Sequence, residues 1–317
     1  MTAAHPPAEA SIDAPARAAA KSRWGLRSAL RAALVLFVGG LLVYMGTSVY
    51  VADKLSHPKR RAIQLTCADY GPTCREVRFT SAVDDVPLEG WFIDAPGTTA
   101  ILQLHGRNGA RDDFAEVTRE LVREGYDVLT FDFRAHGESG GERYSLGPLE
   151  TRDVEGALAY LKEQGATEVG VIAYSMGAAT ALLAAPDHPE IEALVVDSPF
   201  ADLPSVLERE LPRNSGLPSI FNPGIIVAGQ VAFGIDLTIN RPVEAVRRLN
   251  DRPILLIHGA EDALIPVSHA YSLRDAAGGN PNFEMWVVPG VGHVKAYGST
   301  PTEYLERVTS FFDTHLK

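Results

Sequence analysis

Three residues of this chain could together carry out acyl transfer: Ser175, Asp262 and His293. A serine hydroxyl attacks a carbonyl group once a base takes its proton, and a histidine held by a carboxylate is a suitable base. The order serine, acid, histidine is the one expected of such a triad in an open, mostly parallel sheet. We therefore predict that Ser175 is the nucleophile, His293 the general base and Asp262 the acid that orients it.

The surroundings of Ser175 fit a sharp turn between a strand and a helix. Ala173 and Gly177 flank it at the small-x-Ser-x-Gly spacing of a nucleophile elbow, with Ala173 where the motif usually has Gly. An apolar strand, 169–174, precedes the turn, and a helix of small residues, 178–185, follows it. A serine that only caps a core helix would use the same residues, so the elbow depends on the other two members of the triad.

An acyl-transfer site also needs two N–H groups for the oxyanion of the tetrahedral intermediate. We assign one to the backbone of Met176, directly after the nucleophile, and the other to the backbone of Arg107, in the loop after an apolar strand. The Arg107 side chain could face solvent or an anionic part of a substrate.

Several other residues end strands in the same way. Asp197 is an alternative to Asp262 as the orienting acid, because it also follows an apolar strand. His105 and His258 each precede a glycine at a strand end and are more simply structural, and His136 is expected to order its loop.

The elements that position these residues alternate between strand and helix from Arg75 onward, which predicts an α/β fold: a mostly parallel sheet with helices on both faces. The first two strands form an antiparallel opening pair. The predicted strands cover residues 76–80, 87–93, 99–104, 127–133, 169–174, 193–197, 253–258 and 284–288, and helices cover 111–124, 149–163, 178–185 and 301–315.

Residues 199–250 interrupt this alternation with an apolar stretch that also contains prolines and glycines. A crossover between two strands needs far fewer residues, so the excess predicts a helical cap over the sheet edge. Such a cap would suit an acyl or other hydrophobic substrate, although it could also pack on the body and bind nothing.

The N-terminal part divides by composition into three segments. Residues 1–31 are rich in Ala, Pro and basic residues and predict a disordered tail, 32–52 form an uncharged run long enough for a transmembrane helix, and 53–74 are a linker to the hydrolase domain at 75–317. A cleaved signal peptide is the alternative, but the apolar run and the segment before it are both longer than a signal requires.

The two cysteines, Cys67 and Cys74, enclose a short turn just after the apolar run. We predict a disulfide between them, and hence an oxidising compartment for the catalytic domain, periplasmic or extracellular. Basic residues on the two sides of the span are nearly equal in number, so charge alone does not orient the helix.

Composition excludes other classes of function. The net charge of −11 argues against a nucleic acid partner. No phosphate-binding loop, dinucleotide fingerprint or zinc-protease motif is present, so we expect no cofactor and no metal. The sequence carries no signal for an oligomeric state.

Taken together, the motifs resemble those of α/β-hydrolase-fold serine hydrolases, and more narrowly of the membrane-anchored Bem46-like group. The resemblance covers the chain from about Ser56 and rests on 105–109, 132–139, the Ser175 elbow, 197–199, 258–262 and 292–293. It implies hydrolysis of carboxylic esters or thioesters through an acyl-serine and without a cofactor, and it does not fix the substrate. The expectation of a lipid or acyl substrate comes from the apolar cap. A peptidase of the same fold and a non-catalytic binding protein are the alternatives.

Overall fold

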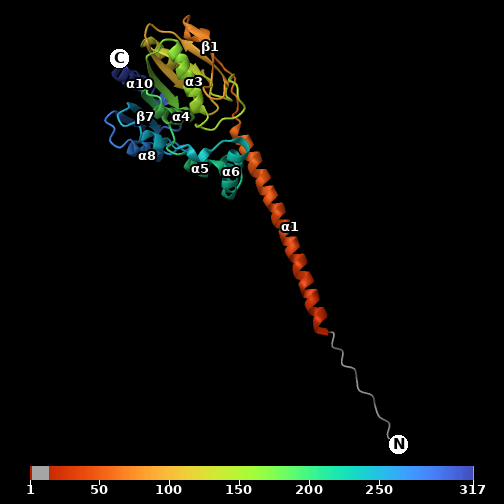
Figure 1. Ribbon diagram of the computed structural model, residues 1–317. Helices are drawn as coiled ribbons and strands as arrows, with labels where there is room; N and C mark the ends of the chain where they lie inside the picture. The colour runs from red at the N-terminus through yellow and green to blue at the C-terminus, as the bar shows by residue number, and fades with distance from the viewer. Residues whose placement is uncertain (2–13, 317) are drawn as a thin grey trace. The chain divides into compact units, whose positions relative to one another are not determined.

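The computed structural model describes residue 1 and residues 14–316, with side chains from Gly25 onward. The chain divides into two units, Met1–Ser48 and Val49–Lys317, which we describe separately. Helix α1 (Ala14–Ser56) contains the described residues of the first unit other than Met1, and its last turns, from Val49, belong to the second. Within the described residues, Gly25–Ser56 is the helix that by itself is long and apolar enough to cross a membrane (Figure 1).

The start of α1 differs from the sequence-based expectation. Residues 14–31 are helical, although the sequence predicted a disordered tail over 1–31. Alanine, arginine and lysine dominate this part and are strong helix formers, and Pro15 stands in the first turn, where proline is tolerated. Residues 2–13 of the predicted tail lie outside the described part.

The second unit is built on an eight-stranded sheet with the order β1-β2-β4-β3-β5-β6-β7-β8. The pairs β1–β2 and β2–β4 are antiparallel, and the other neighbours are parallel. The strands are β1 (Cys74–Thr80), β2 (Pro87–Ile93), β3 (Thr99–Leu104), β4 (Asp127–Phe131), β5 (Glu168–Tyr174), β6 (Ile191–Asp197), β7 (Ile254–Gly259) and β8 (Phe283–Val288).

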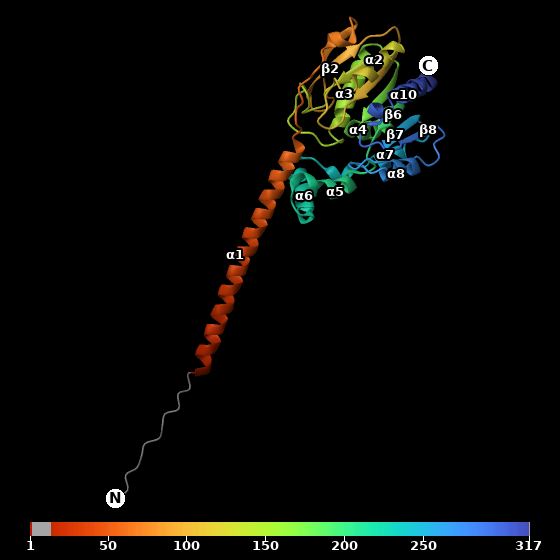
Figure 2. The ribbon, with the colours of Figure 1, turned by 180° about the vertical axis from the view of Figure 1, so that it is seen from behind.

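Helices cover both faces of this sheet (Figures 1 and 2). One apolar cluster joins the sheet to α3 (Glu150–Glu163), α4 (Met176–Ala184), α7 (Pro242–Val246) and α8 (Ser268–Ala276). The opposite cluster joins it to α2 (Ala115–Arg123), α9 (Ala296–Ser299) and α10 (Pro301–Leu316). The central strands are mostly apolar because both of their faces are buried. The predicted α/β-hydrolase fold is therefore confirmed.

The segment predicted as a linker, 53–74, is packed on the body. The Arg60 guanidinium donates hydrogen bonds to four backbone carbonyls between His136 and Gly141. Arg61 forms ion pairs with Asp112 and its neighbour Asp113 in the loop before α2. Sequence patterns did not reveal this, because each contact joins residues far apart in the chain.

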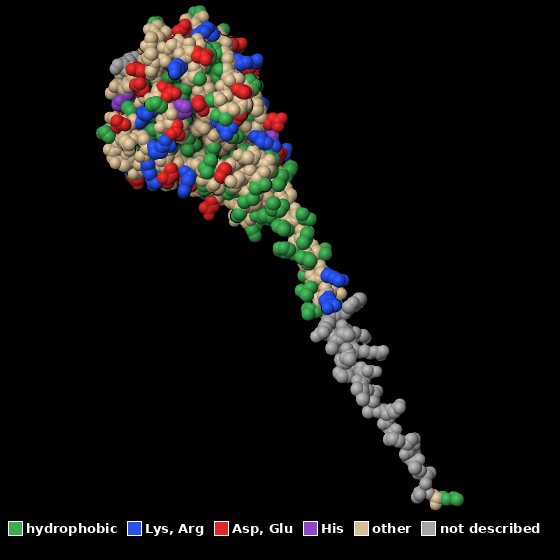
Figure 3. Space-filling model, viewed as in Figure 1, with side chains coloured by type: hydrophobic (Ala, Val, Ile, Leu, Met, Phe, Trp, Pro, Cys, Tyr) green, Lys and Arg blue, Asp and Glu red, His purple; other side chains and the backbone are tan. Residues whose placement is uncertain are grey.

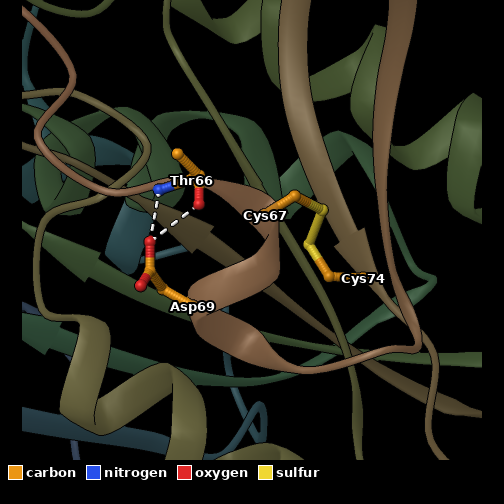
Figure 4. The surroundings of a disulfide bond; sticks show 4 residues. All are labelled: Thr66, Cys67, Asp69 and Cys74. Carbon is orange, nitrogen blue, oxygen red and sulfur yellow. Dashed lines mark hydrogen bonds between the residues drawn. A yellow bond between two sulfur atoms is a disulfide. The ribbon is translucent and has the colours of Figure 1, made fainter.

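The predicted disulfide is present between Cys67 and Cys74 (Figure 4). A 3₁₀ turn, η1 (Cys67–Tyr70), lies inside the loop that it closes. The Asp69 carboxylate accepts hydrogen bonds from the backbone N–H and the hydroxyl of Thr66, which caps the turn. The disulfide therefore connects the start of β1 to a turn that is already ordered by its own hydrogen bonds.

The insertion between β6 and β7 is helical, as the sequence predicted for residues 199–250. It contains α5 (Leu203–Ser215), η3 (Ser219–Phe221), α6 (Asn222–Phe233) and η4 (Leu237–Ile239) before α7. Helices α5 and α6 pack with Val51 and Ala52 of the last turns of α1 in a third apolar cluster. We call α5 to η4 the cap.

Candidate active site

Ser175 lies at the sharp turn between β5 and α4. Its backbone has φ 52° and ψ −113°, a conformation that L-residues other than glycine rarely adopt. The backbone N–H of Ser175 donates to the Asp197 carbonyl at 2.8 Å, which ties the turn to the neighbouring strand. Gly177 is needed for this geometry, because a Cβ there would lie 2.6 Å from the carbonyl oxygens of Leu104 and His105.

The structure joins the three residues of the predicted triad in one chain of hydrogen bonds. Ser175 Oγ lies 2.8 Å from His293 Nε2, and His293 Nδ1 lies 2.6 Å from Asp262 Oδ2. The Asp262 side chain is fully buried, whereas that of His293 is 21% exposed. A neutral His293 with its proton on Nδ1 would donate to Asp262 and accept from Ser175, which is the arrangement that proton removal requires.

The Asp262 carboxylate is held by the loop that follows β7. Its Oδ1 accepts hydrogen bonds from the backbone N–H groups of Leu264 and Ile265, at 2.9 and 2.8 Å. Buried His258 donates from Nε2 to the Ile265 carbonyl at 2.8 Å, and desolvation lowers the pKa of its imidazole. A neutral His258 thus stabilises the loop that carries Asp262 and is not hydrogen-bonded to Ser175.

Asp197, the alternative acid, has different partners. Its carboxylate accepts from the Ser198 hydroxyl at 2.8 Å and from the Tyr304 hydroxyl at 3.2 Å. Burial raises the pKa of Asp197 to about 6. The Ser198 hydroxyl in turn accepts from the backbone N–H of Val294, the residue after the histidine of the triad. Asp197 therefore supports the loop that carries His293 through Ser198, whereas the His293 imidazole itself contacts Asp262.

Arg107 and Met176, whose backbone N–H groups we predicted for the oxyanion, line the same pocket as Ser175. Met176 is the first residue of α4, and Arg107 follows β3. Among the described residues, neither backbone N–H has a hydrogen-bond partner. The helix N-terminus adds its positive dipole end at Met176, so both N–H groups are free to donate to an oxyanion, as we expect of them from the sequence.

His105 fixes the peptide that carries the Arg107 N–H. Its Nε2 accepts from the backbone N–H of Phe133 at 3.0 Å, and its Nδ1 lies 2.7 Å from the Gly106 carbonyl. The first contact requires an unprotonated Nε2, so Nδ1 carries the proton and donates to Gly106. Because a trans peptide directs its C=O and N–H to opposite sides, fixing the Gly106 carbonyl fixes the Arg107 N–H. Burial lowers the pKa of His105 to about 4, which keeps the ring neutral.

The motif at 132–139 is structural. Asp132 accepts from the backbone N–H and the guanidinium of Arg111, and the Arg134 guanidinium pairs with buried Asp153. His136 Nδ1 lies 2.9 Å from the Arg134 carbonyl. Burial lowers the pKa of His136 to about 3, so this ring is also neutral in the folded state. These groups order the loop beside β3, as expected for His136.

Ser175 opens into a mostly apolar pocket of about 990 Å³, counting its open mouth. Its walls come from the cap, from the loop after Asp262, from the 144–146 loop and from the last turns of α1. The apolar side chains that line it are Ala52, Leu55, Tyr144, Leu146, Met176, Phe200, Leu203, Val206, Leu207, Leu211, Ile225, Ile235, Leu237, Leu264 and Ile265.

Two parts of this pocket were missed by sequence reasoning. Ala52 and Leu55 were assigned to the end of a membrane helix and a linker, and Tyr144 and Leu146 were not singled out. The apolar pattern continuing to Leu55, past the predicted end of the span, was a usable signal for the first pair. Nothing local marked the second pair, since their loop reaches the site through tertiary packing.

The described residues contain no group of three or more His, Cys, Asp or Glu side chains placed to hold a metal ion. Among the described residues that line the pocket, the cationic side chain is that of exposed Arg107, whose guanidinium lies 6.0 Å from the Tyr144 ring centroid. The site thus joins a serine, a histidine and a carboxylate in one hydrogen-bond chain beside an apolar cavity, an arrangement that suits acyl transfer.

Comparison with known structures finds the same architecture in an esterase of Pyrococcus furiosus. The chains are 30% identical, the match covers 82% of this chain and 97% of the esterase, and the TM-score is 0.69. The chain belongs to the α/β-hydrolase-fold serine hydrolases. This hydrolase is of the esterase type and acts on ester bonds.

Sequence comparisons place two family patterns on this hydrolase: "Serine aminopeptidase, S33" on residues 96–221 and "Prolyl oligopeptidase family" on residues 235–317. The uncharacterized protein YqkD of Bacillus subtilis is 30% identical over 60% of this chain and 63% of its own length. The mouse sn-1-specific diacylglycerol lipase ABHD11 is 24% identical over 81% of this chain and 94% of its own length.

Proposed function

We propose that this protein is a membrane-anchored serine esterase, of the Bem46-like group, that hydrolyses esters or thioesters with an apolar acyl part. The observation that carries the proposal is the continuous Ser175–His293–Asp262 hydrogen-bond chain at an apolar pocket. The lipase named among its relatives supports a lipid or acyl substrate. No cofactor enters the reaction that we propose.

In the proposed reaction, His293 Nε2 takes the proton of the Ser175 hydroxyl as Oγ attacks the ester carbonyl. The N–H groups of Arg107 and Met176 stabilise the oxyanion, and Asp262 stabilises the imidazolium. When the intermediate collapses, the imidazolium gives its proton to the departing alcohol or thiol. Water, activated by the same imidazole, then releases the acid from the acyl-serine.

The anchor in this proposal is the apolar part of α1. Its length matches a hydrocarbon core, and the body that follows it carries a disulfide. Disulfides persist in oxidising compartments, so we place the catalytic body outside the cytoplasm and the N-terminus inside. The orientation can be tested by adding a protease to sealed cells. A body outside the cytoplasm is cleaved without entry of the protease into the cytoplasm, and a cytoplasmic body is not.

The central experiment is labelling with a fluorophosphonate probe together with hydrolysis of p-nitrophenyl esters. We expect an adduct on Ser175, and we expect Ser175→Ala to lower kcat/KM by about a thousandfold or more, because the members of a triad act as a unit. Ser272→Ala, an exposed helix serine outside the pocket lining, serves as the matched control. A folded protein that neither forms the adduct nor cleaves any ester would support the non-catalytic alternative instead.

The peptidase alternative is favoured by the aminopeptidase and prolyl oligopeptidase patterns. An aminopeptidase needs a carboxylate for the substrate's amino group, and the acidic side chain that lines this pocket, Glu210, is paired with Arg213 at 2.9 Å. A panel of esters of increasing acyl length against aminoacyl amides separates the two. Faster cleavage of the amides would overturn the esterase proposal.

A further inference from the structure

Helix α6 of the cap is apolar on both of its sides. Ile225 and Ala228 are buried against the body, whereas Val227 and Val231 on the outer side are 49% and 81% exposed. The chain carries no charged residue from 214 to 235. Figure 3 shows apolar side chains gathered over this part of the cap.

Such a helix differs from the other covering helices of the same body. The outer side of α10 carries Glu303, Glu306 and Arg307, as expected of a helix with one face in water. A helix that is apolar all round is normally buried, in a protein core or in lipid. The outer side of α6 carries one polar side chain, Gln230, and its valines Val227 and Val231 stay exposed among the described residues, so this surface suits an apolar neighbour.

The last turns of α1 indicate what that neighbour is. Val51 and Ala52 pack in the same cluster as α6, and the Arg143 guanidinium pairs with Asp53 and lies 3.9 Å from the ring centroid of Phe233, the last residue of α6. The end of the apolar helix and α6 are thus fixed to each other within the second unit.

This part of α1 has the residues of a membrane–water interface. Tyr50 is 62% exposed, and the Lys54 ammonium lies 5.9 Å from its ring centroid. Tyrosine and lysine take such positions at the ends of membrane helices, with their apolar parts toward lipid and their polar ends toward water. If α1 leaves the bilayer near Tyr50, α6 lies at the same level.

We propose that the outer side of α6, with Val227 and Val231 at its centre, lies in the headgroup region of the bilayer that α1 spans. The inner side of α6 contributes Ile225 and Gly229 to the pocket, and Ala52 and Leu55 of α1 line the same pocket. Only the thickness of α6 then separates lipid from the cavity beside Ser175. This inference rests on the proposed membrane-anchored esterase and restricts its substrates to lipid esters of that bilayer.

The test places a nitroxide on full-length protein in phosphatidylcholine vesicles, at Val231→Cys and, as control, at Val83→Cys. Both native cysteines are in the disulfide, so each new thiol is labelled selectively. Val83 is a valine in the β1–β2 turn with a comparable 64% exposure. We expect the label at 231 to collide more with oxygen than with a water-soluble nickel chelate, and the label at 83 to show the opposite.

Three results would overturn the proposal. The label at 231 could be as accessible to the nickel chelate as the label at 83. It could show dipolar broadening that disappears when labelled chains are diluted with unlabelled ones, which would make the partner a second copy. It could also be shielded from both reagents without broadening, which would make the partner another protein or another part of the chain.

A second measurement uses activity and separates this inference from the proposed function. Val231→Glu should lower hydrolysis of a long-chain monoacylglycerol dispersed in vesicles by roughly tenfold, because a carboxylate is costly near the acyl chains, and should leave p-nitrophenyl butyrate hydrolysis unchanged. Val83→Glu should change neither. Equal rates for both variants on the vesicle substrate would contradict the membrane contact, whereas wild-type protein inactive on both esters would contradict the esterase itself.

Discussion

Ser175 presents its hydroxyl through a backbone conformation that serine rarely adopts. The strain is maintained by the hydrogen bond from its N–H to the Asp197 carbonyl and by the tight approach of Gly177 to β3. Strained residues of this kind persist where the surrounding structure over-determines them, commonly at catalytic sites. We therefore expect some residues around Ser175 to act by holding the reacting groups in position, without taking part in the reaction themselves.

His105 provides the first such test. His105→Leu removes both ring contacts, so the Gly106 carbonyl keeps only the hydrogen bond from the Gly109 N–H and the Gly106–Arg107 peptide is held less firmly. The oxyanion then loses part of the stabilisation by one proposed donor. We expect kcat to fall by roughly tenfold to a hundredfold with little change in KM. His105→Asn, which retains a donor for the Gly106 carbonyl, should recover part of the loss. A lower melting temperature with kcat unchanged in both variants would show a role in stability alone.

Asp197 provides a test by pH. Its pKa is raised from 3.8 to about 6 by burial, so the folded state holds a proton that the unfolded state has lost over that interval. Its contribution to stability is therefore present below pH 3.8 and is lost as the pH rises through 6, by about 3 kcal/mol in total. Asp197→Asn removes this titration. The melting temperature of the variant minus that of the wild type should increase from pH 4 to pH 7. A difference that stays constant over this range would contradict the raised pKa of the buried Asp197 carboxyl.

At the scale of elements, the site depends on how closely the turn into α4, strand β3 and the loops after β7 and β8 meet. The turn into α4 lies against the end of β3, and the loops after β7 and β8 bring Asp262 and His293 to the same edge. Parallel strands place their carboxyl ends together, so residues far apart in sequence meet there. The tightest of these approaches is at Gly177.

Gly177→Ala tests that approach. The added methyl would lie 2.6 Å from two carbonyl oxygens of β3 and the residue after it, which forces α4 or β3 to shift. We expect a loss of roughly 1–3 kcal/mol in stability and a fall in activity, because the turn carries the hydroxyl. Thermal melts and ester kinetics on the same preparation measure both. Gly298→Ala is the matched control, because a Cβ there meets no atom within 4 Å, and equal effects of the two variants would refute the argument.

At the scale of the whole molecule, the segment after α1 is part of the folded body. Arg60 and Arg61 bind it to the loops beside β3, and the disulfide closes it next to β1. The catalytic body therefore begins at the final turns of α1, where Ala52 and Leu55 line the pocket. The end of α1 is thus a structural element of the pocket.

The disulfide gives a test at this scale. Replacing Cys67 and Cys74 together by serine should lower stability by about 2–3 kcal/mol, because a loop of this size is no longer closed in the unfolded chain. Dithiothreitol should lower the melting temperature of the wild type toward that of the double variant and leave the variant unchanged. A wild type purified from its own membrane with both thiols free would contradict the extracytoplasmic placement.

The sequence by itself determined the alternation of strands and helices, the elbow spacing at Ser175, the order of the triad residues and the pairing of the two cysteines. These are local patterns, or the chain order of patterns, and they follow from side-chain periodicity and turn chemistry. Tertiary structure alone decided that Asp262 and not Asp197 contacts His293, because both acids end apolar strands and only the packing of the loops distinguishes them. It also decided that Leu55 and Tyr144 line the pocket, because contacts between residues far apart in the chain do not produce a local sequence pattern.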